Sequence, residues 1–396
     1  MKELRAYLKV GSECRVKNRI YFFNRTFNGL FYLDIKDFTV HYVHRFSAEK
    51  RTSDNLSLAR SIVYKNIVYF FPCNGAGFIM GYDTERRQEE LIRVPVIQNS
   101  PLDVVEVMPQ ENKIYLFPSD FSKGIYVFDL NKRSVTKDEK LSSLFKSRLV
   151  CSNDVIAFGN NCMLIGIEGT NEIIEVDLEN KRIVKSIKLE ANIKIYSINF
   201  DGSHYWILQT ESTDIYEWDK ERNILQRYTC EQIRGESNTG RPYSNIIFSE
   251  DKIFVLCFSK ASVLHINKLN RTVDNLTAIP KGFQCVNKKC VGTAMFGHYT
   301  ETEKKVFLFP GRGNMVLIYD KTDGKMIGKE FIISEKDVPY LREVQNEIFL
   351  SKSLHVEDDD LETLEGYMYA VEVNEDKDNV EKKRMVGGLI LQTCLA

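Results

Sequence analysis

The sequence predicts an all-β protein built from repeats, and two observations carry this prediction. Residues 113–129, KIYLFPSDFSKGIYVFD, closely match residues 305–320, KVFLFPGRGNMVLIYD. Short runs rich in Val, Ile, Tyr and Phe also recur along the 396 residues, each bounded by Gly, Asn, Asp, Ser or Lys, which is typical of β-strands. No window repeats the i, i+3, i+4, i+7 apolar spacing of helices. Helix is therefore expected to be a minor component.

The repeat has two anchors that keep a common period. By subtraction of residue numbers, the first anchor, an aromatic or large apolar residue, recurs every 42 to 53 residues. Its members are Tyr21, Tyr69, Tyr115, Met163, Trp206, Phe254, Phe307 and Phe349. The second anchor follows as Asp34, Asp83, Asp129, Asp177, Asp219, Asn267, Asp320 and Glu372. Periods of roughly 40–50 residues indicate propellers or helical arrays, and the strand-like runs favour propellers.

Each repeat contains enough strands for one propeller blade. Within residues 58–95, four strands are predicted in the order LARSIVYKN, IVYFFP, AGFIMGYD and QEELIRVPV, the content of a four-stranded blade. Similar strand-like runs occur in the other repeats, namely RIYFF, GLFYLD, FTVHYV, KIYLF, GIYVFD, EIIEVD, KIFVL and MVLIYD. Eight anchors predict a β-propeller of eight blades. Seven is the alternative, if segments from both ends, ELRAYLKV and RMVGGLIL, complete one blade.

The second anchor is expected to be structural. It opens connections such as DTERRQ, DLNKRS, DLENKR, DKERNI and DKTDGK. An aspartate in this position accepts hydrogen bonds from backbone N–H groups further along the turn. We therefore interpret these residues as turn caps and not as an acid/base or metal set.

The repeats resemble known propeller families. Residues 125–132, IYVFDLNK, and 318–325, IYDKTDGK, are similar to the third strand and turn of Kelch-type and quinoprotein-type propeller repeats, and the resemblance runs over nearly the whole chain. The Kelch double glycine and the quinoprotein tryptophan are absent from these repeats. The resemblance thus implies a fold and transfers no active site.

Bulk properties exclude several classes of function. The formal charge of −1, from 54 basic and 55 acidic residues, gives no global field for a phosphate backbone, so no nucleic-acid partner is expected. No signal peptide and no run of 18 apolar residues is present, so we expect a cytoplasmic protein with no membrane partner. GxSxG, HExxH and a glycine-rich phosphate loop are also absent from the sequence. We predict no enzyme, no cofactor and no metal site.

The last twelve residues differ from the repeats. Residues 1–384 are predicted to form a single propeller domain, and residues 385–396, MVGGLILQTCLA, an apolar tail. This tail is either a closing strand or a presented segment. In the second case Gly387 and Gly388, with Thr393 and Cys394, are similar to the double-glycine cleavage point and modification sites of bacterial peptide precursors.

A binding site is predicted on the face with the longer loops. In propellers the loops between strands two and three share one face with the blade-to-blade connections, which are long here, and function favours elaborated loops. The starts of the innermost strands would line the mouth of the central channel on that face. These residues are Arg60, Asp103, Arg148, Tyr196, Arg241, Tyr243 and Arg342. Converging arginines suit a carboxylate or phosphate ligand, unless each arginine pairs with a nearby acidic residue.

Two functional hypotheses follow from these observations. The first is a non-catalytic binding scaffold that uses the loop-rich face for a protein, a peptide or an anionic small molecule. The alternative is a carrier or substrate protein whose C-terminal tail, GGLILQTCLA, is recognised, cleaved or modified by a partner enzyme.

Overall fold

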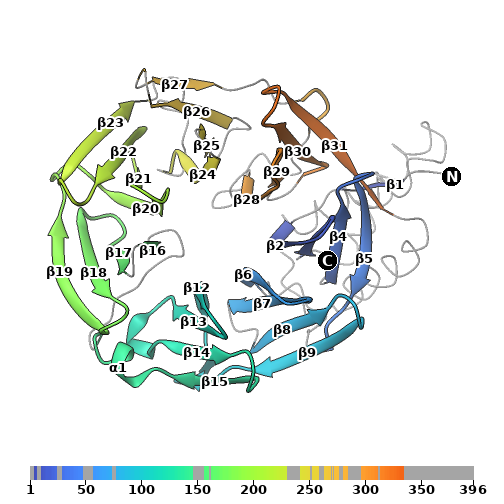
Figure 1. Ribbon diagram of the computed structural model, residues 1–396, viewed down its shortest axis with the longest axis horizontal. Coiled ribbons are helices and arrows are strands. Elements are labelled where there is room, and N and C mark those ends of the chain that lie inside the picture. The colour runs from blue at the N-terminus through green and yellow to red at the C-terminus, as the bar shows by residue number, and fades with distance from the viewer. Residues whose placement is uncertain are drawn as a thin grey trace, which may run out of the picture. The chain divides into compact units, whose positions relative to one another are not determined.

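The computed structural model describes most of the chain as far as residue 333. The described residues are 4–6, 10–24, 29–47, 57–73, 77–145, 156–159, 162–229, 241–249, 252–257, 263–268, 270, 272–275, 280–283, 296–310 and 313–333. Within them the protein is all-β, with seven four-stranded blades of a β-propeller (Figure 1). The predicted fold class is confirmed.

The chain divides into two compact units, and the first contains the first and last of these blades. Blade 1 is formed by β2 (Val10–Val16), β3 (Arg19–Asn24), β4 (Gly29–Asp34) and β5 (Thr39–His44). Blade 7 is formed by β28 (Phe296–Glu301), β29 (Lys305–Pro310), β30 (Met315–Asp320) and β31 (Met326–Ile333). The short strand β1 (Leu4–Ala6) pairs with β31.

The second unit contains blades 2 to 6. Blade 2 contains β6 (Ser57–Tyr64), β7 (Ile67–Cys73), β8 (Phe78–Asp83) and β9 (Gln88–Arg93), and blade 3 contains β12 (Val104–Gln110), β13 (Lys113–Pro118), β14 (Tyr126–Asp129) and β15 (Ser134–Lys137). Blade 4 contains β16 (Ile156–Gly159), β17 (Cys162–Gly166), β18 (Glu172–Asp177) and β19 (Arg182–Lys188), and blade 5 contains β20 (Ile195–Phe200), β21 (Tyr205–Gln209), β22 (Asp214–Asp219) and β23 (Ile224–Thr229). Blade 6 contains β24 (Tyr243–Ser249), β25 (Lys252–Cys257), β26 (Val263–Asn267) and β27 (Thr272–Asn275). Within this unit the first strand of each blade lies innermost and the fourth outermost (Figure 1).

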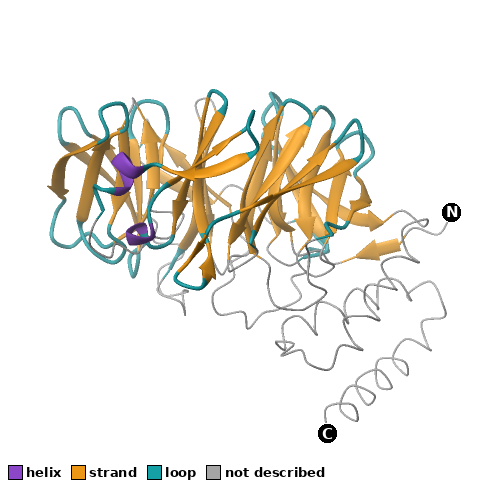
Figure 2. Ribbon diagram, turned by 90° about the horizontal axis from the view of Figure 1, so that it is seen from below, coloured by secondary structure: helices purple, strands orange, loops and turns teal. Residues whose placement is uncertain are grey.

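Four smaller elements complete the second unit. Strands β10 (Val96–Ile97) and β11 (Ser100–Pro101) form a hairpin between blades 2 and 3. The 3-10 helix η1 (Phe121–Lys123) and the helix α1 (Glu139–Ser142) are the helical segments among the described residues, drawn in purple in Figure 2. Neither of them is long enough to cross a membrane.

The predicted number of eight blades is wrong, and the seven-blade alternative is what the described residues show. The reason lies in the first unit, where the fourth strand of blade 7 pairs in parallel with the fourth strand of blade 1, Ile332 opposite Thr39 and Ile333 opposite Val40. This pairing leaves no space between the two blades for an eighth. The eighth pair of anchors, Phe349 and Glu372, lies outside the described residues, as do the predicted closing segment RMVGGLIL and the tail.

The central strands of the blades are buried on both faces. Strand β17 is buried at every residue, and β7 and β29 have five consecutive buried residues each. In the second unit, neighbouring blades pack on both faces of blades 3 to 5, which explains why their central strands read as continuous apolar runs rather than as alternating ones. One cluster joins blades 2 and 3, another blades 3 to 5, a third blades 5 and 6, and a fourth blades 1 and 7.

The second anchors cap turns, as predicted. The Oδ1 atom of Asp129 accepts hydrogen bonds from the backbone N–H groups of Asn131 and Lys132, both at 2.9 Å. Asp83 does the same for Glu85 and Arg86. Equivalent bonds are made by Asp34, Asp177, Asp219, Asn267 and Asp320. These residues are therefore occupied in holding the turn between the third and fourth strands.

Candidate binding sites

The starts of the first strands and the loops between second and third strands lie at the same end of the second unit. In blade 3 the N–H of Ser119 donates to the carbonyl of Asp103 at 3.3 Å, and in blade 5 the N–H of Thr210 donates to the carbonyl of Lys194 at 3.0 Å. Both contacts connect the residue that precedes a first strand with the residue that follows a second strand. The predicted geometry of the loop-rich face is thereby confirmed for these blades.

Three blades contribute to a group at this end, which we call the Arg241 site (Arg241, Glu168 and Tyr196). The Nη2 atom of Arg241, just before blade 6, lies 2.7 Å from Oε1 of Glu168 in the loop after β17. The Arg241 guanidinium carbon lies 4.7 Å from the centre of the Tyr196 ring on β20. Arg241 is 39% exposed and Glu168 31% exposed, whereas Tyr196 is buried. The stacked ring and the carboxylate together fix the guanidinium at the surface.

Arg60 pairs with a carboxylate of the next blade. Its Nε and Nη2 atoms lie 3.0 and 2.8 Å from Oε1 and Oε2 of Glu106, a bidentate pair between β6 and β12. Both residues directly follow a bulge in the first strand of their blade. Ser197 and Asn245 occupy the position after the bulge in blades 5 and 6. The bulge thus brings a polar side chain to the same place in four blades.

The remaining predicted residues differ in accessibility. The carboxylate of Asp103 accepts a hydrogen bond from the Ser119 hydroxyl at 2.8 Å. Tyr243 is fully buried in the core between blades 5 and 6 and donates its hydroxyl to the carbonyl of Thr213 at 2.7 Å. Arg148 and Arg342 lie outside the described residues, as do the tail residues Gly387, Gly388, Thr393 and Cys394. The convergence of four arginines therefore stays a prediction.

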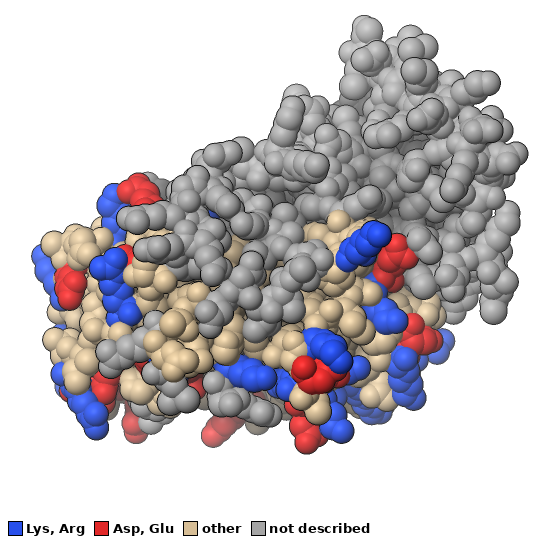
Figure 3. All heavy atoms as spheres, turned by 90° about the horizontal axis from the view of Figure 1, so that it is seen from above, with Lys and Arg blue, Asp and Glu red and all other residues tan. Residues whose placement is uncertain are grey.

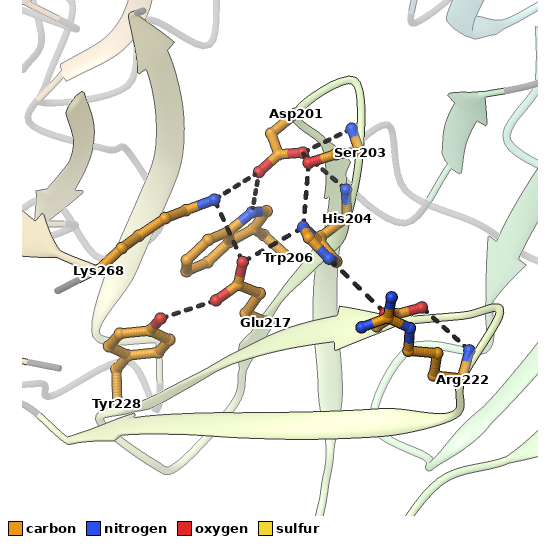
Figure 4. A network of polar contacts seen from close by, with 9 residues as sticks. Asp201, Ser203, His204, Trp206, Glu217, Arg222, Tyr228 and Lys268 are labelled. Atoms are coloured by element: carbon orange, nitrogen blue, oxygen red, sulfur yellow. Dashed lines mark hydrogen bonds and ion pairs between the residues drawn. The ribbon is translucent and has the colours of Figure 1, made fainter. Parts of the chain in front are cut away.

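A second polar group lies among the turns of blades 5 and 6, and we call it the Lys268 cluster (Asp201, Glu217, Trp206 and Lys268; Figure 4). Asp201 lies in the turn between β20 and β21, Glu217 on β22 and Trp206 on β21. Lys268 follows β26 in the next blade. Its Nζ atom lies 3.1 Å from Oδ2 of Asp201, 3.2 Å from Oε1 of Glu217 and 5.1 Å from the centre of the Trp206 ring.

Both carboxylates of this cluster are held by donors from their own blade. Oδ1 of Asp201 accepts from the N–H groups of Ser203 and His204 at 2.8 and 2.7 Å, and Oδ2 accepts from the Trp206 indole at 2.9 Å. Oε2 of Glu217 accepts from the Tyr228 hydroxyl at 2.7 Å. The side chains of Asp201 and Glu217 are 8% and 15% exposed. These bonds orient both carboxylates independently of Lys268.

The pKa values follow from this arrangement. Burial by itself raises the pKa of Asp201, but the hydrogen bonds from His204, Trp206 and Ser203 outweigh burial and hold this pKa well below its usual range. Burial by itself lowers the pKa of Lys268, but the contacts with Asp201 and then Glu217 outweigh it and raise the pKa. Asp201 and Lys268 are therefore both charged at neutral pH.

One blade earlier, an equivalent lysine makes a simpler contact. Lys220 follows the second anchor of blade 5 and places its Nζ atom 2.6 Å from Oε1 of Glu175 on β18 and 3.7 Å from Sγ of Cys162. Burial lowers the pKa of Lys220, but the hydrogen bond with Glu175 and the charges nearby raise it overall. Lys220 and Lys268 thus share a position in the repeat but differ in what surrounds them.

Sequence reasoning did not identify the Lys268 cluster. The sequence does contain a recurring pattern at these positions. A lysine directly follows the second anchor at Lys220, Lys268 and Lys321, and a glutamate stands two residues before the second anchor at Glu175 and Glu217. Lys220 and Lys268 contact these two glutamates across a blade boundary, about one period away in sequence. The signal becomes useful only once the lateral packing of blades is known.

Comparisons with known proteins extend the fold assignment. No protein-family model and no curated protein matches the chain. Among solved structures, a catalytically inactive virginiamycin B lyase from Staphylococcus aureus with quinupristin is 10% identical and aligns over 79% of this chain and 97% of its own, with a TM-score of 0.55. YCF48 bound to a D1 peptide is 8% identical over 81% of this chain and 94% of its own, with a TM-score of 0.54. At such identities the likeness concerns the fold alone, and by fold this chain is a β-propeller.

Proposed function

We propose that the protein is a non-catalytic binding module and that the end carrying the Arg241 site receives a protein or peptide partner. The observation that carries this proposal is the assembly of Arg241, Glu168 and Tyr196 from three blades. Arginine and tyrosine are enriched among the residues that dominate binding energy at interfaces. An arginine held by a ring and a carboxylate loses little conformational freedom when a partner docks.

A protein or peptide is favoured over a bare anion by the charges at this end. Arg241 faces Glu168 and Arg60 faces Glu106, so both described arginines have a carboxylate within 2.8 Å. On the side of the molecule drawn in Figure 3, at right angles to the view of Figure 1, Lys and Arg are likewise interspersed with Asp and Glu over the described residues. A small anion would meet these carboxylates as well as the guanidinium groups. A peptide can bond to both kinds of group.

Affinity capture with matched variants tests the proposal. We expect Arg241→Ala to reduce recovery of the partner by about tenfold or more, the effect of removing one central interface arginine. Arg222→Ala serves as the control, because Arg222 is 78% exposed and lies in the turn between β22 and β23, at the other end of the blade. If Arg241→Ala, Arg222→Ala and the unmodified protein all recover the partner equally, then the partner does not bind at the Arg241 site.

Thermal denaturation in phosphate, sulfate and citrate tests the small-anion alternative. At low concentrations of these anions we expect no saturable rise in melting temperature, because Arg60 and Arg241 are each paired with a carboxylate. At high concentrations only the gradual rise that such salts give proteins in general should appear. A saturable rise of a few degrees that is lost in Arg60→Ala or Arg241→Ala would favour an anionic small ligand instead.

A further inference from the structure

The Lys268 cluster separates into a preformed receptor and an occupant. The groups that orient the two carboxylates, Ser203, His204, Trp206 and Tyr228, all belong to blade 5 (Figure 4). Lys268 belongs to blade 6 and supplies the cation. Its side chain is 38% exposed, so the place that it fills is open to solvent on one side.

The geometry of this receptor suits a primary ammonium group. An ammonium has three N–H donors on one tetrahedral nitrogen. Here one oxygen from each of the two carboxylates lies near Nζ of Lys268, at 3.1 and 3.2 Å. The Trp206 ring, whose centre is 5.1 Å from Nζ, adds the aromatic face that attracts cations. A guanidinium prefers the parallel oxygens of one carboxylate, so the arrangement favours an amine over an arginine side chain.

A metal ion is the competing occupant. Ligand atoms of Asp201, His204 and Glu217 lie within 4.8 Å of one another. However, Nζ of Lys268 contacts two of these three residues, so a divalent cation would have to displace the ammonium. The two carboxylates are already neutralised in part by that ammonium, which favours the amine.

We propose that Asp201, Glu217 and Trp206 form a binding site for a primary alkylammonium group, which Lys268 fills as an internal ligand. When Lys268 is shortened, the site takes an alkylammonium ion from solution. This site lies among the turns and is separate from the Arg241 site, so it does not depend on the function proposed above.

The test uses the full-length Lys268→Ala variant with n-propylammonium chloride, because alanine lacks three carbons and the ammonium of the lysine side chain. Relative to sodium chloride of equal ionic strength, we expect the melting temperature to rise by about 1–2 °C at ten times the dissociation constant. The change should saturate and should be accompanied by a change in tryptophan fluorescence, since Trp206 is one of only two tryptophans. The unmodified protein should show neither change.

Three matched variants separate a site from a general salt effect. Lys268→Met keeps the apolar stem in place without the charge and should not respond. Glu217→Gln combined with Lys268→Ala should lose the response. Lys220→Ala, which removes the equivalent lysine beside a single glutamate, should also show no saturable response, and 1-propanol should not replace the amine.

Specific outcomes overturn the proposal. The proposal is refuted if propylammonium raises the melting temperature of Lys268→Ala no more than sodium chloride does. It is also refuted if the double variant with Glu217→Gln responds as strongly as Lys268→Ala alone. A response to Zn²⁺ that saturates at lower concentration than the amine and is lost with His204→Ala makes it a metal site instead. If Lys268→Ala does not fold in sodium chloride, its refolding yield in propylammonium is the readout, and an unchanged yield refutes the proposal.

Discussion

Two of the lysine residues directly after a second anchor, Lys220 and Lys268, make contacts across blade boundaries. Lys220 and Lys268 each reach back to a glutamate two residues before the anchor of the preceding blade, Glu175 and Glu217. Their partners are therefore set by position in the repeat and not by neighbours in sequence. Partly buried pairs of this kind are costly to break on one side only, because the other charge is left without compensation.

Asp201 gives the stability of the protein a specific acid dependence. Its pKa in the folded state lies below the value of about 3.9 for an unfolded aspartate. This carboxylate therefore contributes stability that is fully present above about pH 4 and is lost as the pH falls towards the folded pKa. For Asp201→Asn we expect a free energy of unfolding that declines less steeply below pH 4, by up to about 1.4 kcal/mol per pH unit.

Urea unfolding at a series of pH values from 5 to 2.5 measures this slope. Glu221→Gln, at an exposed turn position of the same blade, is the control and should follow the unmodified protein. Equal slopes for Asp201→Asn and the unmodified protein would show that Asp201 does not titrate between the folded and unfolded states in this range.

At this scale the sequence predicted which residues begin the first strands but not what they contact. Arg241 and Tyr196 were both chosen by this rule, and they lie together. Glu106 and Glu168, the acidic partners of Arg60 and Arg241, were not foreseen, because each comes from a different blade. Tyr243 was chosen by the same rule but is fully buried, since a strand start does not reveal which face its side chain takes.

Among the elements, the central strands were the most predictable and the seam between first and last blades the least. Strands such as β7 and β29 are apolar throughout because they are covered on both sides. The outermost strand β19, RIVKSIK, is largely exposed and lacks such a signal. The count of eight blades failed because anchors are local, whereas the pairing of β31 with β5 joins residues from opposite ends of the described chain.

Strand β31 is central to this seam because it pairs with three strands. Ile332 lies opposite Arg5 of β1 and opposite Thr39 of β5, and β31 also pairs with β30. We expect Ile332→Pro to lower the free energy of unfolding by about 3 kcal/mol or more, because proline removes a ladder donor and is poorly tolerated within a sheet.

Chemical denaturation with Ile332→Ala as control separates backbone from side chain. The alanine variant keeps the N–H group and should be less destabilised than the proline variant. Equal losses for the two would assign the effect to the isoleucine side chain and not to the pairing of the strand.

At the scale of the whole molecule, the described blades do not require a strand from the tail. Blade 7 already has four strands, and β31 is already paired with β1 and β5. We therefore expect removal of residues 385–396 to change the melting temperature by less than about 2 °C, since the described strands of blades 1 and 7 would keep their partners.

Removal of residues 1–6, which deletes β1, provides the contrast and should lower the melting temperature more. Differential scanning calorimetry measures both changes. A loss of several degrees on tail removal would identify the tail as a closing strand. Unchanged stability would leave it as a candidate presented segment, the condition that the carrier hypothesis needs.

The pairing of β31 with β1 and β5 has a consequence for biosynthesis. Blade 1 leaves the ribosome early, but its outer strand finds its partner only after residues 326–333 have been translated. Until then the backbone groups of β5 form an open strand edge, and such edges invite association with other chains. Nascent chains of this protein thus carry the outer edge of blade 1 without its partner β31 through most of their synthesis.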